Sequence, residues 1–122
     1  YERHYTKVDP KHFEPIVDGM WRGVNVGGTS TAARLEGLDV CGKTGTAENP
    51  RGRDHSTFLS FAPKDNPKIA ISVYVENGGF GASAALPIAS LLEEYYLTDT
   101  IRRPALLEHI KNMNIYYPSY DR

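Results

Sequence analysis

The chain has 122 residues and a formal net charge of −1. This length suits one modest domain, and it is small for an enzyme that carries complete nucleotide-binding or acyl-transfer machinery. The 14 Lys and Arg residues are scattered along the sequence, so the basic surface of a nucleic-acid-binding protein is missing. The single cysteine, Cys41, excludes an internal disulfide and a cysteine-based zinc site, and it leaves the redox compartment open.

The first predicted element is a helix that follows Asp9-Pro10, a capping residue with proline at the first helical position. Pro15 would remove a hydrogen bond to Lys11, so the regular helix is expected to begin only at Pro15. The helix is expected to end near Asn25. Its apolar face consists of Phe13, Ile16, Val17, Met20, Trp21 and Val24. A Gly-, Ser- and Thr-rich connection follows, with one helical turn predicted at residues 31–35.

Three strands are predicted next, at residues 38–47, 56–62 and 68–76. The second strand is apolar on both faces through Phe58, Leu59 and Phe61, which predicts a strand covered on both sides. The third alternates between apolar and polar positions, as a strand with one buried face does. The turn "PKDNPK" joins these two strands into an antiparallel hairpin. We therefore expect an antiparallel sheet with residues 56–62 in the middle.

A helix over residues 84–97 is predicted to pack on this sheet. The face assigned to the core consists of Ala85, Ile88, Ala89, Leu92 and Tyr96, and Glu93-Glu94 is assigned to the solvent-exposed side. A short helix is expected at residues 104–110, and the end "YYPSYDR" is expected to be loosely held. The sequence does not decide whether Tyr116, Tyr117 and Tyr120 pack on the domain or contact a partner.

The stretch "EGLDVCGKTGTAENP" matches two different motifs. Gly37, four residues, and Gly42-Lys43-Thr44 fit the phosphate loop, while Lys43-Thr44-Gly45 fits the K-T-G element of penicillin-recognising serine enzymes. A phosphate loop needs an apolar strand before it and a helix starting at the Lys. "STAARLE" is not such a strand, and the glycines and proline after Thr44 do not start a helix. Nucleotide binding is therefore disfavoured.

On a strand, Lys43 and Gly45 point to one face, and Thr44 and Thr46 point to the other. One short segment then presents a cation, two hydroxyls and a position without a side chain. An edge strand of this kind can bind an extended peptide by strand addition, and its N–H groups can stabilise an oxyanion.

The surrounding sequence resembles the carboxyl-terminal part of the transpeptidase domain of class B penicillin-binding proteins, in the order "CGKTGTAE", "DHSTFLSFAP", "NPKIAISVYVENG" and "SAALPIASLLEEY". "RDH" and "VENGG" favour the elongation-type group, penicillin-binding protein 2. The resemblance covers about residues 9–98, so residues 1–98 are assigned to this domain portion and 99–122 to a tail. It implies an α+β fold, an antiparallel sheet with packed helices of the penicillin-binding protein/serine β-lactamase-like type.

The resemblance also implies a function. Class B enzymes are peptidoglycan D,D-transpeptidases. A serine attacks a D-alanyl-D-alanine stem peptide, the terminal D-alanine leaves, and the acyl group passes to an amine of a neighbouring peptidoglycan strand. β-Lactams trap the serine, and no cofactor or metal is implied. By this resemblance Lys43 and Thr46 are catalytic, the backbone N–H of Thr46 being an oxyanion donor. Thr44, Gly45 and Thr46 bind substrate, with the two hydroxyls on its carboxylate and Gly45 keeping the cleft clear.

The chain departs from the family in lacking the nucleophile motif S-x-x-K and the S-x-N motif. No Lys stands three residues after any of its serines, which are Ser30, Ser56, Ser60, Ser72, Ser83, Ser90 and Ser119. We therefore expect a fragment that is inactive alone, from a parent anchored on the periplasmic side of the inner membrane among cell-wall synthesis partners. The alternative is a non-catalytic folding or interaction module, distinguished by whether both motifs lie upstream of Tyr1.

Three further expectations concern single features. His55 is interpreted as structural and left out of the catalytic set. Cys41 is interpreted as a small buried hydrophobic residue rather than a reactive thiol. The third strand, residues 68–76, is expected to leave an open sheet edge, which a dimer or residues 1–6 would protect.

Overall fold

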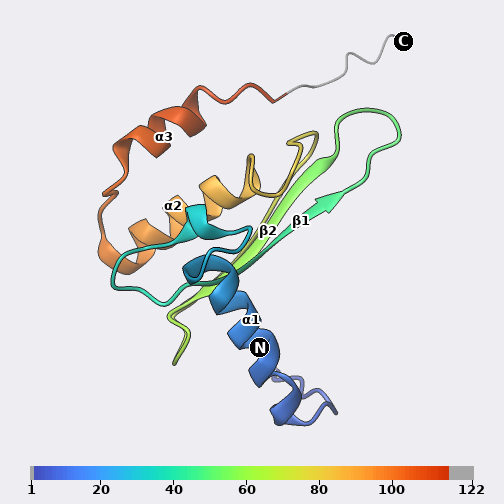
Figure 1. Cartoon of the computed structure of the whole chain (residues 1–122), viewed down its shortest axis with the longest axis vertical. Coiled ribbons are helices and arrows are strands. Elements are labelled where there is room, and N and C mark those ends of the chain that lie inside the picture. Colours follow the sequence, from blue (N-terminus) through green and yellow to red (C-terminus); the bar gives the residue numbers. More distant parts are fainter. Residues whose placement is uncertain (1, 116–122) are drawn as a thin grey trace.

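The computed structural model describes residues 2–115, and Figure 1 shows the arrangement of the elements. The elements in chain order are the 3-10 helix η1 (Pro10–His12), α1 (Glu14–Asn25), the 3-10 helix η2 (Thr31–Ala33), β1 (Cys41–Ala47), β2 (His55–Ala62), β3 (Ile69–Val75), α2 (Ala85–Thr98) and α3 (Pro104–Lys111). The expectations for Tyr116, Tyr117 and Tyr120 lie outside the described residues. No helix in the described part has the length and apolarity needed to cross a bilayer.

The three strands form one antiparallel sheet in the order β1-β2-β3, so the predicted α+β class and the central position of β2 are confirmed. The β2–β3 turn is closed by a hydrogen bond from Lys68 N to Ala62 O at 2.8 Å, and Asn66 takes a positive φ of 55° there. β3 alternates between exposed and half-buried residues, as its sequence predicted. β1 begins at Cys41 rather than at residue 38, because residues 35–38 form a separate small bridge.

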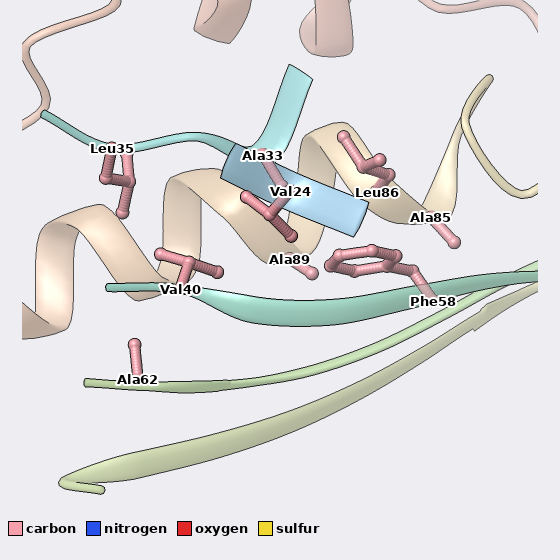
Figure 2. Packing of buried hydrophobic residues seen from close by; sticks show 9 residues of the cluster. All are labelled: Val24, Ala33, Leu35, Val40, Phe58, Ala62, Ala85, Leu86 and Ala89. Atoms are coloured by element: carbon pink, nitrogen blue, oxygen red, sulfur yellow. The ribbon is translucent and has the colours of Figure 1, made fainter. Parts of the chain in front are cut away.

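The core lies on one face of the sheet, between β1, β2, α2 and the end of α1 (Figure 2). Phe58 on β2 is its largest side chain and is 1% exposed. The Phe58 ring passes over Gly42 on the neighbouring strand, where a Cβ would lie 2.5 Å from Phe58 Cζ. A larger residue at position 42 would displace the ring from a close-packed interior. Packing therefore explains the glycine at position 42.

The opposite face of β2 is open among the described residues, so the predicted two-sided cover is wrong for this part of the chain. Leu59 is 48% exposed and Tyr74 on β3 is 56% exposed. α2 and the end of α1 both lie on the Phe58 side, as Figure 2 shows for Val24, Leu86 and their neighbours. The apolar composition of β2 does not reveal which of its faces these elements cover.

Among the described residues, β3 has no strand partner on its outer edge, and residues 2–6 form no strand that could pair with it. The protection expected from this segment is therefore not seen. Pairing between two copies of the chain stays a prediction.

The predicted core face of α2 is confirmed only in part: Ala85 and Ala89 are buried, but other predicted members of that face are not. Leu92 and Tyr96 are 52% and 59% exposed, whereas Leu86, Ser90 and Glu93 are buried. Apolar residues surround this helix on most sides, so their spacing does not define one face. Contacts with the sheet and with Arg103 decide the orientation instead, and they bury Glu93 and Glu94, which the sequence placed in solvent.

α1 packs on the sheet only through its carboxyl-terminal end, and its amino-terminal half projects away (Figure 1). Of the predicted apolar face only Val24 is buried, and Ile16 is 60% exposed. Asp9-Pro10 begins the short helix η1, where the Asp9 carboxylate accepts a hydrogen bond from Lys11 N. The α-helix itself starts at Glu14, so Pro15 falls in its first turn, where no hydrogen bond is lost.

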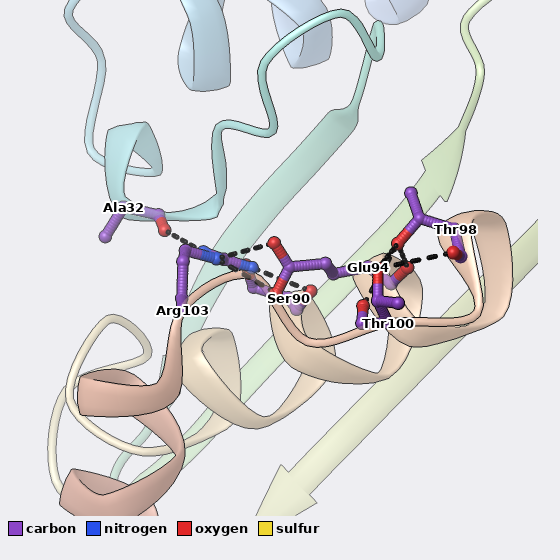
Figure 3. A network of polar contacts seen from close by, with 6 residues as sticks. All are labelled: Ala32, Ser90, Glu94, Thr98, Thr100 and Arg103. Carbon is purple, nitrogen blue, oxygen red and sulfur yellow. Dashed lines mark hydrogen bonds and ion pairs between the residues drawn. The ribbon is translucent and has the colours of Figure 1, made fainter.

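A polar network fastens α3 to the rest of the domain (Figure 3). The Arg103 guanidinium, just before α3, donates to both carboxylate oxygens of Glu94 at 3.3 Å and to the Ser90 hydroxyl at 2.7 Å. It also donates to the carbonyls of Ser90 and Ala32, at 3.0 and 3.3 Å. One side chain thus joins α2, η2 and α3, and it neutralises a carboxylate that is almost fully buried.

We expect Arg103→Met to destabilise the fold by about 2–3 kcal/mol, because Glu94 would remain buried with no cation and Ser90 would lose its donor. Urea denaturation measures the free energy of unfolding. Arg102→Met is the matched control, since Arg102 is exposed and makes no ion pair among the described residues. Equal losses in the two variants would contradict the assigned role.

Candidate active site

β1 lies at the edge of the sheet, with Lys43, Thr44, Gly45 and Thr46 along it. Gly45 pairs with Thr57 of β2. Gly45 N and Thr57 O both lie close to the point where a Cβ at Gly81 would stand, at 2.9 and 2.7 Å. The two atoms are therefore close together, which places these backbone groups between β1 and β2, facing each other. Backbone groups alternate in direction along a strand, and those of Thr44 and Thr46 therefore point to the outer edge. No strand of the described residues pairs there, which is the arrangement that strand addition requires.

Lys43 is exposed on this strand. Its Nζ donates to Thr44 O at 2.6 Å, a carbonyl that faces the outer edge. The ammonium forms no ion pair among the described residues, so its charge is held at the edge by a neutral acceptor. This places an uncompensated cation beside the groups that would bind an extended peptide.

The hydroxyls of Thr44 and Thr46 lie on the other face of β1, as predicted. Thr44 pairs with Phe58 and Thr46 with Ser56, both on the core face of β2. The Thr44 hydroxyl lies 3.3 Å from the Thr29 hydroxyl, and the Thr46 hydroxyl accepts a hydrogen bond from Gly81 N at 3.3 Å. Strand periodicity thus placed the two predicted threonines correctly relative to Lys43.

Sequence reasoning missed both of these neighbours, Thr29 and Gly81. Thr29 belongs to "GGTSTAA" and Gly81 to "NGGFGAS", stretches that look like connections because they are rich in glycine and small polar residues. No spacing rule links either stretch to β1. The only available signal was that each contains polar groups within a conspicuously glycine-rich loop.

Gly45 faces the side chain of Thr57, whose Oγ1 occupies the space that a Cβ at position 45 would need. Cross-strand packing alone is therefore a reason for glycine at this position. Its predicted role in keeping a substrate cleft clear stays a prediction.

His55 and Cys41 have structural surroundings. His55 Nδ1 accepts a hydrogen bond from Asn77 N at 3.0 Å, and its ring lies 5.4 Å from the Tyr74 ring. The contact supports the structural interpretation of His55. Cys41 is fully buried, and this burial raises the pKa of its thiol to about 11, which agrees with a small buried hydrophobic residue.

The geometry rules out the phosphate-loop interpretation. Gly42-Lys43-Thr44 lies inside an antiparallel strand, and no helix begins at Lys43. The N–H groups of a helix amino terminus, which cradle phosphate in such loops, are therefore not present at this motif. Residues 2–115 also contain no group of three or more His, Cys, Asp or Glu side chains arranged to hold a metal ion.

An edge strand carrying K-T-G-T, backed by two strands and a carboxyl-terminal helix, is the arrangement expected for a penicillin-recognising transpeptidase. Residues 2–92 match the family model described as the penicillin binding protein transpeptidase domain. The chain belongs to this family.

Curated relatives are of the class B, penicillin-binding protein 2 type. The chain is 36% identical over 106 residues to the peptidoglycan D,D-transpeptidase MrdA of Haemophilus influenzae, covering 73% of this chain and 16% of the relative. It is 34% identical over 87 residues to the peptidoglycan D,D-transpeptidase PbpA of Mycolicibacterium smegmatis, covering 68% and 17%. The chain thus spans about a sixth of the length of these relatives.

Solved structures agree with this assignment. Penicillin-binding protein 2 of Pseudomonas aeruginosa, in complex with WCK 5153, matches with a TM-score of 0.67 and 35% identity, over 78% of this chain and 21% of that one. Penicillin-binding protein A of Mycobacterium tuberculosis, as an imipenem acyl-enzyme complex, matches with a TM-score of 0.67 and 30% identity over the same shares. These likenesses confirm the transpeptidase fold.

Proposed function

We propose that this chain forms the K-T-G wall of the active site in a peptidoglycan D,D-transpeptidase that β-lactams acylate. The outer edge of β1 carries the proposal, because Lys43, the two threonine hydroxyls and outward-facing backbone groups lie together on a strand whose outer edge has no strand partner among residues 2–115. Two similar proteins support the same reaction, since one is a peptidoglycan D,D-transpeptidase and the other was solved as an imipenem acyl-enzyme.

In the proposed reaction the stem peptide lies along β1 as an additional strand. A serine outside this chain attacks the carbonyl of the penultimate D-alanine, the Thr46 N–H stabilises the oxyanion, and the terminal D-alanine leaves with a proton. An amine of a second stem peptide then attacks the acyl-enzyme and releases the serine. Lys43 and the hydroxyls of Thr44 and Thr46 bind the carboxylate that the departing residue carries.

The setting of this reaction is part of the proposal. Peptidoglycan is assembled outside the inner membrane, so we place the parent protein on the periplasmic side, anchored to that membrane and associated with other cell-wall synthesis proteins. The competing function, a folding or interaction module without a site, does not explain an exposed lysine that has no ion pair within residues 2–115 and lies next to outward-facing backbone groups.

The chain alone is expected to form no covalent adduct with penicillin, because positioned donors act only when a nucleophile reaches the carbonyl. None of its seven serines has the neighbouring lysine that activates the nucleophile. The test is incubation with a fluorescent penicillin, followed by denaturing electrophoresis and intact-mass analysis.

The full-length transpeptidase that contains this chain is the positive control and should be labelled stoichiometrically. An adduct on the 122-residue chain would identify one of its own serines as the nucleophile. Absence of labelling in the full-length protein would refute the proposed function itself.

A further inference from the structure

Ser56 is a buried serine that holds the loop between β3 and α2 against the sheet. It lies on β2 and is 0% exposed. Its hydroxyl donates to Phe80 O at 2.8 Å, has Gly81 O within 3.2 Å, and accepts from Ala85 N at 3.0 Å. This last contact caps the amino terminus of α2, whose own N-cap residue, Ala84, provides no side-chain cap.

The same loop reaches the proposed active site through Gly81. Its N–H donates to the Thr46 hydroxyl oxygen, and Thr46 is the register partner of Ser56. The Gly81 backbone lies directly on the β1–β2 pair, since a Cβ there would come within 2.5 Å of Gly45 O. Ser56 therefore fixes the backbone on both sides of the amide that contacts Thr46.

This contact determines what the Thr46 hydroxyl can do. A hydroxyl has one proton and two acceptor lone pairs. The Gly81 N–H occupies one lone pair, so the Thr46 proton points away from Gly81 and stays available to an acceptor at the open edge. A carboxylate is such an acceptor, and a hydrogen bond to it is stronger than one to a neutral group.

We propose that Ser56 is a positioning residue: by fixing the 80–85 loop it holds the Gly81 N–H on Thr46 and directs the Thr46 hydroxyl proton toward the substrate carboxylate. The inference rests on the proposed function. It adds a residue without any contact to the substrate, on a strand behind the site, that acts through Gly81 and Thr46.

The sheet provides a matched control for Ser56. Ser60 is a second buried serine on the same face of β2, 3% exposed; its hydroxyl makes no hydrogen bond of normal geometry among the described residues and lies near the Glu93 carboxylate rather than the loop. Ser56→Ala and Ser60→Ala remove the same atom from the same face of one strand. Only the first variant removes the contacts that hold the loop.

The test uses the full-length transpeptidase and two ligands, benzylpenicillin and its methyl ester, in which the carboxylate is blocked. The second-order rate constant of acylation is measured for each, and their ratio reports on recognition of the carboxylate. We expect Ser56→Ala to lower the acid-to-ester ratio by about 10-fold, the size of one hydrogen bond to a charged group. Ser60→Ala should leave the ratio unchanged.

A loss of stability alone would slow both ligands equally and keep the ratio, so an unchanged ratio in Ser56→Ala overturns the inference. In a Thr46→Val background, Ser56→Ala should lower the ratio no further, and an additional loss there would also overturn it. If Ser56→Ala does not fold, Ser56→Cys takes its place, because it keeps nearly the same size with weaker hydrogen bonds. If the unmutated protein is not acylated at all, the proposed function fails and the inference fails with it.

Discussion

Lys43→Ala in the full-length transpeptidase should lower the rate of acylation by benzylpenicillin on the order of 10²-fold or more. The Lys43 ammonium has no counter-ion among the described residues and is held at the outer edge of β1 by Thr44 O. Its charge is therefore free to stabilise the carboxylate and the charge that develops at the reacting carbonyl. Stopped-flow or gel-based labelling with a fluorescent penicillin measures the rate.

Lys68→Ala is the control for a general loss of positive charge, since Lys68 is an exposed lysine before β3, on the far side of the sheet from β1. It should acylate at the parental rate. Thr44→Val should act differently from Lys43→Ala, weakening recognition of the ligand more than the acylation step, because it removes a hydroxyl and no charge. Acylation of Lys43→Ala at the parental rate would show that the site has been assigned to the wrong residues.

The parts of the fold that local physics determines could be predicted from the sequence. β3 alternates strictly between apolar and polar residues and follows a turn of Pro, Asp and Asn. Together these two features fit only an antiparallel hairpin with β2. The glycines around Lys43 exclude a helix, which left a strand and placed Lys43 opposite the threonines. Both conclusions depend on neighbours in sequence, where periodicity and turn chemistry act directly.

What could not be predicted depends on contacts between distant segments. Nothing near Ser56 in the sequence indicates that it binds a loop 24 to 29 residues later, or that Gly81 returns to Thr46. The buried face of α2 was predicted only in part, for a similar reason. A helix with apolar residues on most sides is oriented by its partners, and here those partners bury a glutamate while leaving Leu92 and Tyr96 in solvent.

That glutamate, Glu93, gives the second large expected effect. It is 0% exposed, on the face of α2 that packs on the sheet, and neither carboxylate oxygen has a hydrogen-bond partner of normal geometry among the described residues. Burial raises its pKa from 4.5 to about 7. The Ser60 hydroxyl and the Arg103 charge oppose this rise and lower the pKa by less. The protonated form is thus the one that the fold accommodates.

The sign of the pH dependence follows from the two pKa values. In the unfolded chain Glu93 loses its proton near its ordinary pKa of 4.5, whereas in the folded chain it keeps the proton until the pH approaches 7. Between these values the unfolded state binds fewer protons, so the contribution of Glu93 to stability falls as the pH rises. This loss of stability amounts to about 3 kcal/mol in total and is complete once the pH lies above the pKa of Glu93 in the folded chain.

Glu93→Gln should remove this dependence, because the amide is close in shape to the protonated acid and does not ionise. We expect the variant to match the unmutated chain near pH 4.5 and to exceed its free energy of unfolding by about 3 kcal/mol at pH 8. Urea denaturation at a series of pH values gives both curves, and the difference between them cancels the contributions of other carboxylates. Glu76→Gln removes a carboxylate at an exposed position after β3 and is measured alongside as the control for loss of a surface charge. If the Glu93→Gln difference did not change with pH, Glu93 would be ionised within the fold, which would require a cation or water bound at its carboxylate.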